Sequence, residues 1–273
     1  MVSTDGVIGD NRRMFPTRRA WFSLPMVVLA CASVVAAPTS HRVRLDGADF
    51  RIVDLDLARD RLELRWKAGD GRALATIEAL QRWGSDDGKT LQFATNAGIY
   101  DRQFRPLGLY VEDARTLRPL NTAQGSGSQG NFSMQPNGVF FVDRTGHAGV
   151  VTTQAWRDHP IDARIATQSG PMLVVDGALN ANFDATSDSR KWRSGVCAKT
   201  PGNVTFAVSE APVTFHAFAR LFRDELGCSD ALYLDGTLSR IYTASNGFAG
   251  APTMMVKPYV GMFAVFGEEP AAH

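Results

Sequence analysis

The segment Ala231–Gly236, which reads Ala-Leu-Tyr-Leu-Asp-Gly, constrains this chain more than any other stretch. Its apolar residues predict a short buried strand, and Asp235 stands where that strand ends in a glycine turn. Upstream, apolar side chains recur at helical spacing over Phe215–Leu226, and Gly227 ends the helix. A carboxylate at the end of a core strand is costly unless it is paired or functional. The alternative is that Asp235 only caps a turn before Gly236.

Three further stretches share a composition of glycine, amide or hydroxyl side chains and apolar flanks. They are Phe93–Tyr100, Asn131–Phe141 and Ile165–Val175. Glycine lets the backbone approach a ligand closely, and amide side chains supply both donors and acceptors. Each stretch alone is typical of a turn, and Asn137-Gly138 is a hairpin signal in its own right. Together with the segment around Asp235, they predict polar loops that converge on one site.

Composition narrows the class of protein. The chain has 273 residues, of which 44% are hydrophobic and 21% charged, and its formal net charge is +1. This length predicts a single domain with one sizeable core, and the balanced charge argues against nucleic acid as a partner. The HExxH and paired CxxC spacings of metal sites are absent, so no cofactor is expected. The alternative is a divalent cation bound by Asp235 and nearby loop amides.

Residues 1–37 have the pattern of an export signal. Two arginine pairs precede an apolar run from Ala20 to Val35, which is too short for a convincing membrane span, and small residues follow it. The folded domain is therefore expected over residues 42–268. This pattern predicts an exported protein that meets a membrane only through its signal or a lipid anchor.

The end of the signal has two interpretations. Ala36-Ala37 resembles a cleavage site, although Pro38 directly after it would hinder the peptidase. Val28–Cys31 instead resembles a lipoprotein box in which Cys31 is the lipidated residue. The protein is accordingly expected in the periplasm or lipid-anchored in the cell envelope.

Two cysteines remain once the signal is removed, Cys197 and Cys228. An even number of cysteines in an exported protein favours a disulfide between them. The alternative is a pair of buried thiols.

Strand patterns dominate the rest of the chain. They fall at Phe50–Leu57, Arg61–Trp66, Leu91–Asn96, Leu107–Val111, Val139–Asp143, Ala148–Thr153, Ile165–Thr167, Met172–Val175, Val204–Ser209, Leu232–Asp235, Arg240–Thr243 and Val260–Phe266. Helical spacing occurs at Leu74–Trp83 and Phe215–Leu226. The first two strands are expected to pair through a turn at Ala58–Asp60. The pattern predicts an α+β fold, a single domain with a mixed, mostly antiparallel sheet and a few helices packed on it.

Five short motifs stand in the order seen in the phosphodiester glycosidase family. They are Asn96–Tyr100, Asn137–Phe140, Gln168–Pro171, Arg193–Val196 and Tyr233–Gly236. The chain resembles that family over roughly residues 50–267, and it is most similar to the exported bacterial members. The resemblance implies hydrolysis of the C1–O bond between a sugar and a phosphodiester. The expected ligand is a sugar-phosphate diester or a cell-envelope glycan.

Site roles follow from that chemistry. Asp235 is the candidate nucleophile or general base at the anomeric carbon. Arg193 is the candidate phosphate clamp, because a guanidinium binds two phosphate oxygens at once; the alternative is a solvated loop among neighbouring basic residues. The candidate substrate-binding residues are Asn96, Gly98, Asn137, Gly138, Gln168, Ser169, Gly170, Ser194, Gly236 and Ser239. For Asn96, Asn137, Gln168 and Ser169 the alternative is a structural role that satisfies a turn.

Two other classes of function are the alternatives to a glycosidase. A non-catalytic exported protein that binds carbohydrate or phosphoglycan would keep the amide-rich loops without needing an ionised Asp235. An acyl-transfer hydrolase would need a Gly-x-Ser-x-Gly elbow between a strand and a helix. Gly125–Gly130 matches that pattern only loosely and lacks this strand–helix context, so we reject the hypothesis of an acyl-transfer hydrolase.

Overall fold

The computed structural model describes residues 37–123, 130–236, 239–255 and 258–268, all within one compact unit. The expected signal segment, with Cys31 and its lipoprotein box, lies outside the described residues. So does most of Gly125–Gly130. Among the described residues, no helix is both long and apolar enough to cross a membrane.

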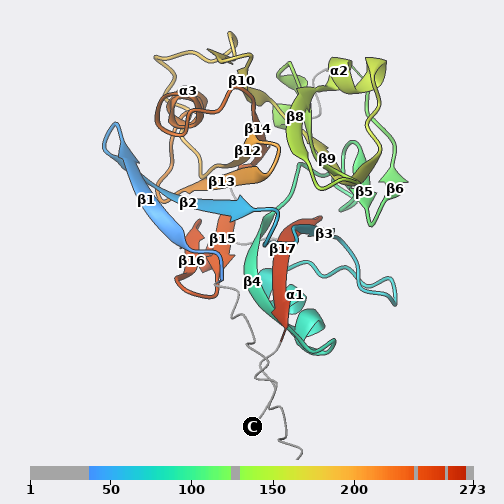
Figure 1. Ribbon diagram of the computed structural model, residues 1–273. Coiled ribbons are helices and arrows are strands. Elements are labelled where there is room, and N and C mark those ends of the chain that lie inside the picture. The colour runs from blue at the N-terminus through green and yellow to red at the C-terminus, as the bar shows by residue number, and fades with distance from the viewer. Residues whose placement is uncertain (1–36, 124–129, 237–238, 256–257, 269–273) are drawn as a thin grey trace, which may run out of the picture. The chain divides into compact units, whose positions relative to one another are not determined.

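The strands form three antiparallel sheets (Figure 1). The seven-stranded sheet has the order β1 (Ser40–Leu45), β2 (Ala48–Asp56), β13 (Asn203–Ser209), β12 (Ser194–Thr200), β14 (Ala231–Asp235), β10 (Met172–Val175) and β11 (Ala178–Leu179). The second sheet has β16 (Gly247–Gly250), β15 (Arg240–Thr243), β4 (Lys89–Asn96), β17 (Met262–Glu268) and β3 (Glu63–Arg65). The third has β6 (Arg115–Arg118), β5 (Tyr110–Glu112), β9 (Ala163–Ser169), β7 (Gly138–Asp143) and β8 (Ala148–Thr152).

Short helices cover the outer faces of these sheets (Figure 1). Helix α1 (Ile77–Ser85) packs on β4, α2 (Thr153–Asp158) on β7 and β8, and α3 (Phe215–Arg220) on β10 and β11. Each is capped by the threonine before it, whose hydroxyl accepts a hydrogen bond from the third backbone N–H. A π turn, Leu221–Glu225, continues α3, and 3-10 turns occupy Gly130–Ser133 and Thr253–Met255.

Four phenylalanines join the three sheets at the centre of the core. Phe206 lies on the first sheet, Phe93 and Phe263 on the second, and Phe140 on the third. The ring centroids of Phe206 lie 5.1 Å from those of Phe93 and Phe263, and Phe140 lies 5.3 Å from Phe263. All four side chains are buried, so this cluster fixes how the sheets pack.

The predicted α+β class is confirmed, and most of the predicted strands are present. The predicted pairing of Arg61–Trp66 with the preceding strand is wrong. That segment forms β3, which pairs with β17 instead. At the turn, Asp60 accepts a hydrogen bond from Asp56 N and pairs with Arg59, and the chain passes from the first sheet into the second. Six elements of the structure were not predicted from the sequence: β1, β6, β11, β12, β16 and α2.

The predicted disulfide between Cys197 and Cys228 is confirmed. The Cα atoms of the two residues lie 6.2 Å apart, and both side chains are buried. The bond ties β12 to the segment that follows α3, and so it fixes the start of β14, the strand that carries Asp235.

Replacing both cysteines by serine is expected to lower the free energy of unfolding by about 3–4 kcal/mol, since the bond closes a loop across a sequence separation of 31 residues. Urea unfolding followed by circular dichroism would measure the difference. A reductant should destabilise the wild type and leave the double variant unchanged. An equal effect of the reductant on both proteins would contradict the prediction.

Candidate functional site

Hydrogen bonds gather five of the expected site residues where strands from all three sheets end. We call Asn96, Ser169, Ser194, Asp235 and Ser239 the strand-end cluster. Ser194 Oγ lies at its centre, because it accepts a hydrogen bond from Asn96 Nδ2 at 2.8 Å and lies 3.0 Å from Ser239 Oγ. Ser239 Oγ also lies 2.8 Å from the Asp235 carbonyl oxygen. Asp235 N donates a hydrogen bond to Ser194 Oγ at 3.3 Å, so both serines hold the backbone at Asp235.

The Asp235 carboxylate is half-buried at the end of β14. Its Oδ1 accepts a hydrogen bond from Gly236 N at 2.5 Å, the one donor to this carboxylate among the described residues. Loss of solvent raises the pKa of Asp235 to about 6, and the Gly236 bond offsets only part of that rise. A carboxyl group with this pKa is mostly ionised at pH 7 and can still accept a proton, which suits a base.

Two tyrosines lie within the electrostatic reach of Asp235. Burial raises the pKa of Tyr100 to about 12, and the negative charge of Asp235 contributes to the rise. Burial also raises the pKa of Tyr259, with Asp235 acting in the same direction and Arg240 against it. Tyr100 stacks on the exposed Phe104 with ring centroids 5.8 Å apart. The acid therefore has aromatic neighbours, which are common where proteins contact sugars.

Ser169, at the end of β9, ties the third sheet to the cluster. Its hydroxyl donates a hydrogen bond to Leu234 O at 3.0 Å and accepts one from Ile99 N at 3.3 Å. Gly98 lies against the same strand, since a Cβ there would stand 2.8 Å from Gln168 O and 2.9 Å from Thr167 Oγ1. The close approach of these two backbones requires glycine at position 98.

Arg193 is only 1% exposed, so the alternative that it lies in a solvated loop is wrong. Its guanidinium carbon stands 3.6 Å from the ring centroid of Phe215 and 5.6 Å from that of Tyr233. Nε donates to Val213 O at 2.9 Å, and Nη2 to Ser189 O at 3.3 Å. Burial lowers the pKa of Arg193, and Tyr233, which forms a side-chain hydrogen bond with it, opposes this shift where no described carboxylate does.

Asn137, Gly138 and Gly170 form a neighbouring group. Gly138 pairs with Ser169 in the β7–β9 ladder, which joins this group to the strand-end cluster. Asn137 Nδ2 donates to Phe132 O at 2.7 Å, whereas its buried Oδ1 has no hydrogen-bond partner among the described atoms. That Oδ1 lies against Gly170, where a Cβ would stand 1.8 Å from it.

Gln168 is held entirely by protein groups. Its Oε1 accepts hydrogen bonds from Leu109 N and Asn121 N, and its Nε2 donates to Asn121 O and Thr153 Oγ1. These bonds use the full capacity of the amide, so a ligand would have to replace one of them. That Gln168, Asn137, Arg193 and Asp235 line one cleft stays a prediction.

Two residues near the acid, Tyr100 and Tyr259, were not predicted from the sequence, and neither was Arg240, which lowers the pKa of Tyr259. Tyr100 stands inside the motif Asn96–Tyr100, so its aromatic ring was a signal that could have been used. Arg240 directly follows Ser239 and is 7% exposed, with its Nε buried and without a partner in the described part of the chain. For Tyr259 the sequence carries no such signal, because only the fold brings it close to Asp235 and Arg240.

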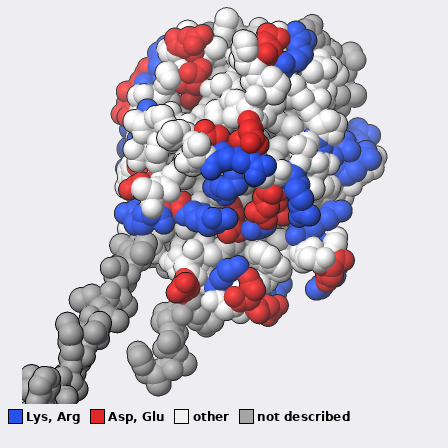
Figure 2. Space-filling view, turned by 45° about the vertical axis from the view of Figure 1, so that its right-hand side comes forward, with Lys and Arg blue, Asp and Glu red and all other residues white. Residues whose placement is uncertain are grey.

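The charged surface is mixed in sign. On the face shown in Figure 2, basic and acidic side chains lie next to one another. Ion pairs such as Arg65 with Glu63 at 2.7 Å and Arg144 with Asp162 at 2.9 Å have this character. In the described ranges no three His, Cys, Asp or Glu side chains gather as a metal site would require.

These observations define an α+β protein with one carboxylate among amides and hydroxyls at its strand ends. Residues 89–256 match the phosphodiester glycosidase family. The uncharacterized protein YigE of Escherichia coli (strain K12) is 35% identical over 206 residues, which make up 76% of this chain and 77% of that protein. The chain belongs to the phosphodiester glycosidase family.

Solved structures share the fold at low sequence identity. One of them is the catalytic domain of zebrafish N-acetylglucosamine-1-phosphodiester alpha-N-acetylglucosaminidase, auto-inhibited by its pro-peptide. Its sequence is 14% identical and the TM-score is 0.57, and the match covers 84% of this chain and 81% of that one. A putative exported protein of Burkholderia pseudomallei K96243 is 11% identical with a TM-score of 0.52, covering 80% and 74%. At these identities the likeness concerns the fold.

Gly98→Ala is expected to lower the free energy of unfolding by about 1–3 kcal/mol, because the added methyl group would push β9 away from Gly98. Thermal or urea unfolding would measure this loss. Gly69→Ala is the matched control, since a Cβ there meets nothing within 4 Å. Equal stabilities of the two variants would show that the close approach is not needed.

Proposed function

We propose that this protein is an exported glycosidase that hydrolyses the C1–O bond of a sugar-1-phosphodiester. Membership in the phosphodiester glycosidase family supports the reaction class. The Asp235 carboxylate carries the assignment to a residue. It is half-buried, has a pKa raised to about 6 by the loss of solvent, and has one hydrogen-bond donor among the described residues. The disulfide is in keeping with export from the cytoplasm.

In this proposal Asp235 either removes a proton from the water that attacks the anomeric carbon or attacks that carbon itself. In the second case water then hydrolyses the sugar–Asp235 ester, which releases the sugar and restores the carboxylate. The C1–O bond breaks, and its electron pair leaves on a phosphate monoester. Because such a monoester is a good leaving group, a strong general acid is less important than a cation near the departing phosphate. Arg193 is the proposed cation, since its buried guanidinium has no carboxylate partner among the described residues.

A panel of sugar-1-phosphodiesters in H₂¹⁸O tests the reaction directly. Cleavage of the C1–O bond places ¹⁸O in the released sugar, whereas cleavage of the P–O bond places it in the phosphate. Mass spectrometry of both products would separate the two. Binding without turnover would instead identify a non-catalytic sugar- or phosphoglycan-binding protein.

Asp235→Asn is expected to lower kcat by at least about 10³-fold while leaving the fold intact, because the amide cannot act as a nucleophile or base. For the wild type, kcat/KM should rise with pH through about 6, as the carboxyl group loses its proton. Initial rates between about pH 4 and 8 would measure both. A rate that falls through this range would exclude Asp235 as the base.

The pH dependence of the free energy of unfolding tests the raised pKa of Asp235 independently of activity. Because its pKa is raised in the folded protein, the group favours folding below about pH 4, and this contribution is lost as the pH rises through about 6. The stability of Asp235→Asn relative to the wild type should therefore increase by about 1–3 kcal/mol between pH 4 and pH 7. A constant difference would show that the carboxylate is not desolvated.

Arg193→Met is expected to lower kcat/KM by about 10²-fold or more and to affect both kcat and KM, because the phosphate loses a charged hydrogen-bond partner. Stability should change little, since the substitution also removes a buried cation without a carboxylate partner. Steady-state kinetics and urea unfolding would measure the two quantities.

Arg65→Met is the control for Arg193. Arg65 is half-buried, and unlike Arg193 it pairs with carboxylates, those of Glu63, Glu112 and Asp113. Its loss should reduce stability and leave kcat/KM of the folded enzyme unchanged. The phosphate role of Arg193 is wrong if Arg193→Met keeps kcat/KM within about threefold of the wild type.

A further inference from the structure

A second polar groove lies between the β1–β2 hairpin and the edge strand β16. We call it the Phe248 groove. It has a volume of about 470 Å³, and its lining includes Arg42, Asp49, Glu210 and Phe248. This volume falls within the range of pockets that hold small organic ligands, roughly 300–1,000 Å³. The groove is distinct from the strand-end cluster, none of whose residues lines it.

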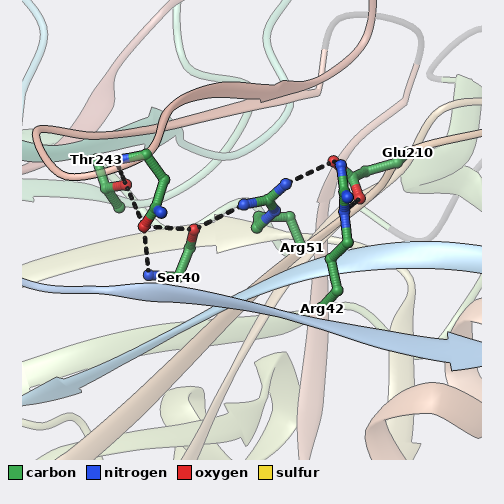
Figure 3. A network of polar contacts seen from close by, with 6 residues as sticks. Ser40, Arg42, Arg51, Glu210 and Thr243 are labelled. Carbon is green, nitrogen blue, oxygen red and sulfur yellow. Dashed lines mark hydrogen bonds and ion pairs between the residues drawn. The ribbon is translucent and has the colours of Figure 1, made fainter.

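The Glu210 carboxylate is held rigidly at this groove. Arg42 Nε donates to Oε2 at 2.7 Å, and Arg51 Nη2 donates to Oε1 at 3.1 Å (Figure 3). Arg51 also donates to Ser40 Oγ at 3.0 Å, and Ser40 contacts Asn246, which belongs to the β15–β16 turn. The two arginines offset the effect of burial and hold the pKa of Glu210 below its ordinary value. The groove thus presents a fixed, ionised acceptor.

Phe248 supplies an aromatic surface beside that acceptor. The residue is 39% exposed although it lies on a strand. The guanidinium carbon of Arg240 stands 4.1 Å from its ring centroid, and the Tyr242 ring centroid lies 5.0 Å away. These contacts fix the ring at the groove, where an exposed aromatic side chain is a preferred partner for an apolar ligand face.

The charges of the groove argue for a neutral ligand. Each charged residue in the lining already has a partner of opposite sign. Arg42 pairs with Glu210, which Arg51 also contacts, and Asp49 pairs with Arg44 at 3.5 Å. An anionic or cationic ligand would therefore meet a partner of its own sign. A single aromatic ring is also too little apolar surface for an acyl chain. Hydroxyl groups, in contrast, can both donate to the carboxylates and accept from Arg42.

We propose that the Phe248 groove binds a neutral oligosaccharide, with one sugar face on Phe248 and hydroxyl groups on Glu210, Asp49 and Arg42. This site goes beyond the proposed reaction and does not depend on it. Gly250, which also lines the groove, packs against the carbonyl oxygen of Ser239 in the strand-end cluster. A glycan in the groove would therefore lie next to the strand that follows Asp235.

Calorimetry of the full chain with neutral tetrasaccharides tests this proposal. The probes are the β-1,4-linked tetramers of N-acetylglucosamine and of glucose, which lack phosphate and so are not substrates of the proposed reaction. At least one is expected to bind with a dissociation constant below about 10 mM that is insensitive to salt. The absence of binding by both, or affinity that falls steeply with salt, overturns the proposal.

Variants locate the binding. Phe248→Ala and Glu210→Gln should each weaken it about tenfold, and Phe248→Trp should keep it within about threefold because the aromatic surface remains. Leu117→Ala is the matched control, since Leu117 is a 42% exposed side chain on the third sheet. Equal affinity of Phe248→Ala and the wild type, or an equal loss in Leu117→Ala, overturns the assignment to this groove.

Discussion

The packing of four phenylalanines from three sheets is the constraint on which the rest of this structure depends. Phe206 is central, because its ring contacts Phe93, Phe140 and Phe263. Burying such rings stabilises the fold by about 1.5–3 kcal/mol each, and their shapes fix the angles at which the sheets meet. Because the sheets meet in this way, Asn96 and Ser194, which end strands of different sheets, are close enough to share a hydrogen bond.

The sequence predicted the elements whose signal is local. Strands β4, β7, β13 and β14 and helix α3 have apolar residues at the spacing of their own element, and their positions were predicted to within a few residues. The partner of β3 could not be found in this way, since Leu64 pairs with Phe263 at the far end of the chain. Strand β12 was missed because basic residues precede it and the lysine at position 199 interrupts its apolar pattern.

The same limit applies to the candidate site. Amides and hydroxyls beside glycine were recognised from sequence, and the fold brings Asn96, Ser194 and Ser239 together around Asp235. Local sequence could not show which partners each amide has. Asn96 bonds to Ser194 Oγ and Arg240 N at the cluster, whereas Gln168 bonds to Leu109 N and Thr153 Oγ1 away from it. Which polar group keeps capacity for a ligand depends on its tertiary partners, and these are not encoded within a short motif.

The charged groups of the molecule divide into two kinds. Arg42, Arg51 and Arg65 have carboxylate partners, as exposed or half-buried charges normally do. Arg193 has an aromatic ring and backbone carbonyl oxygens instead, and no described cation contributes to the pKa of Asp235. A buried charge without an opposite charge is costly to maintain in a folded protein. In the proposed reaction the substrate supplies both missing partners, since its phosphate is anionic and its anomeric carbon becomes positively charged in the transition state.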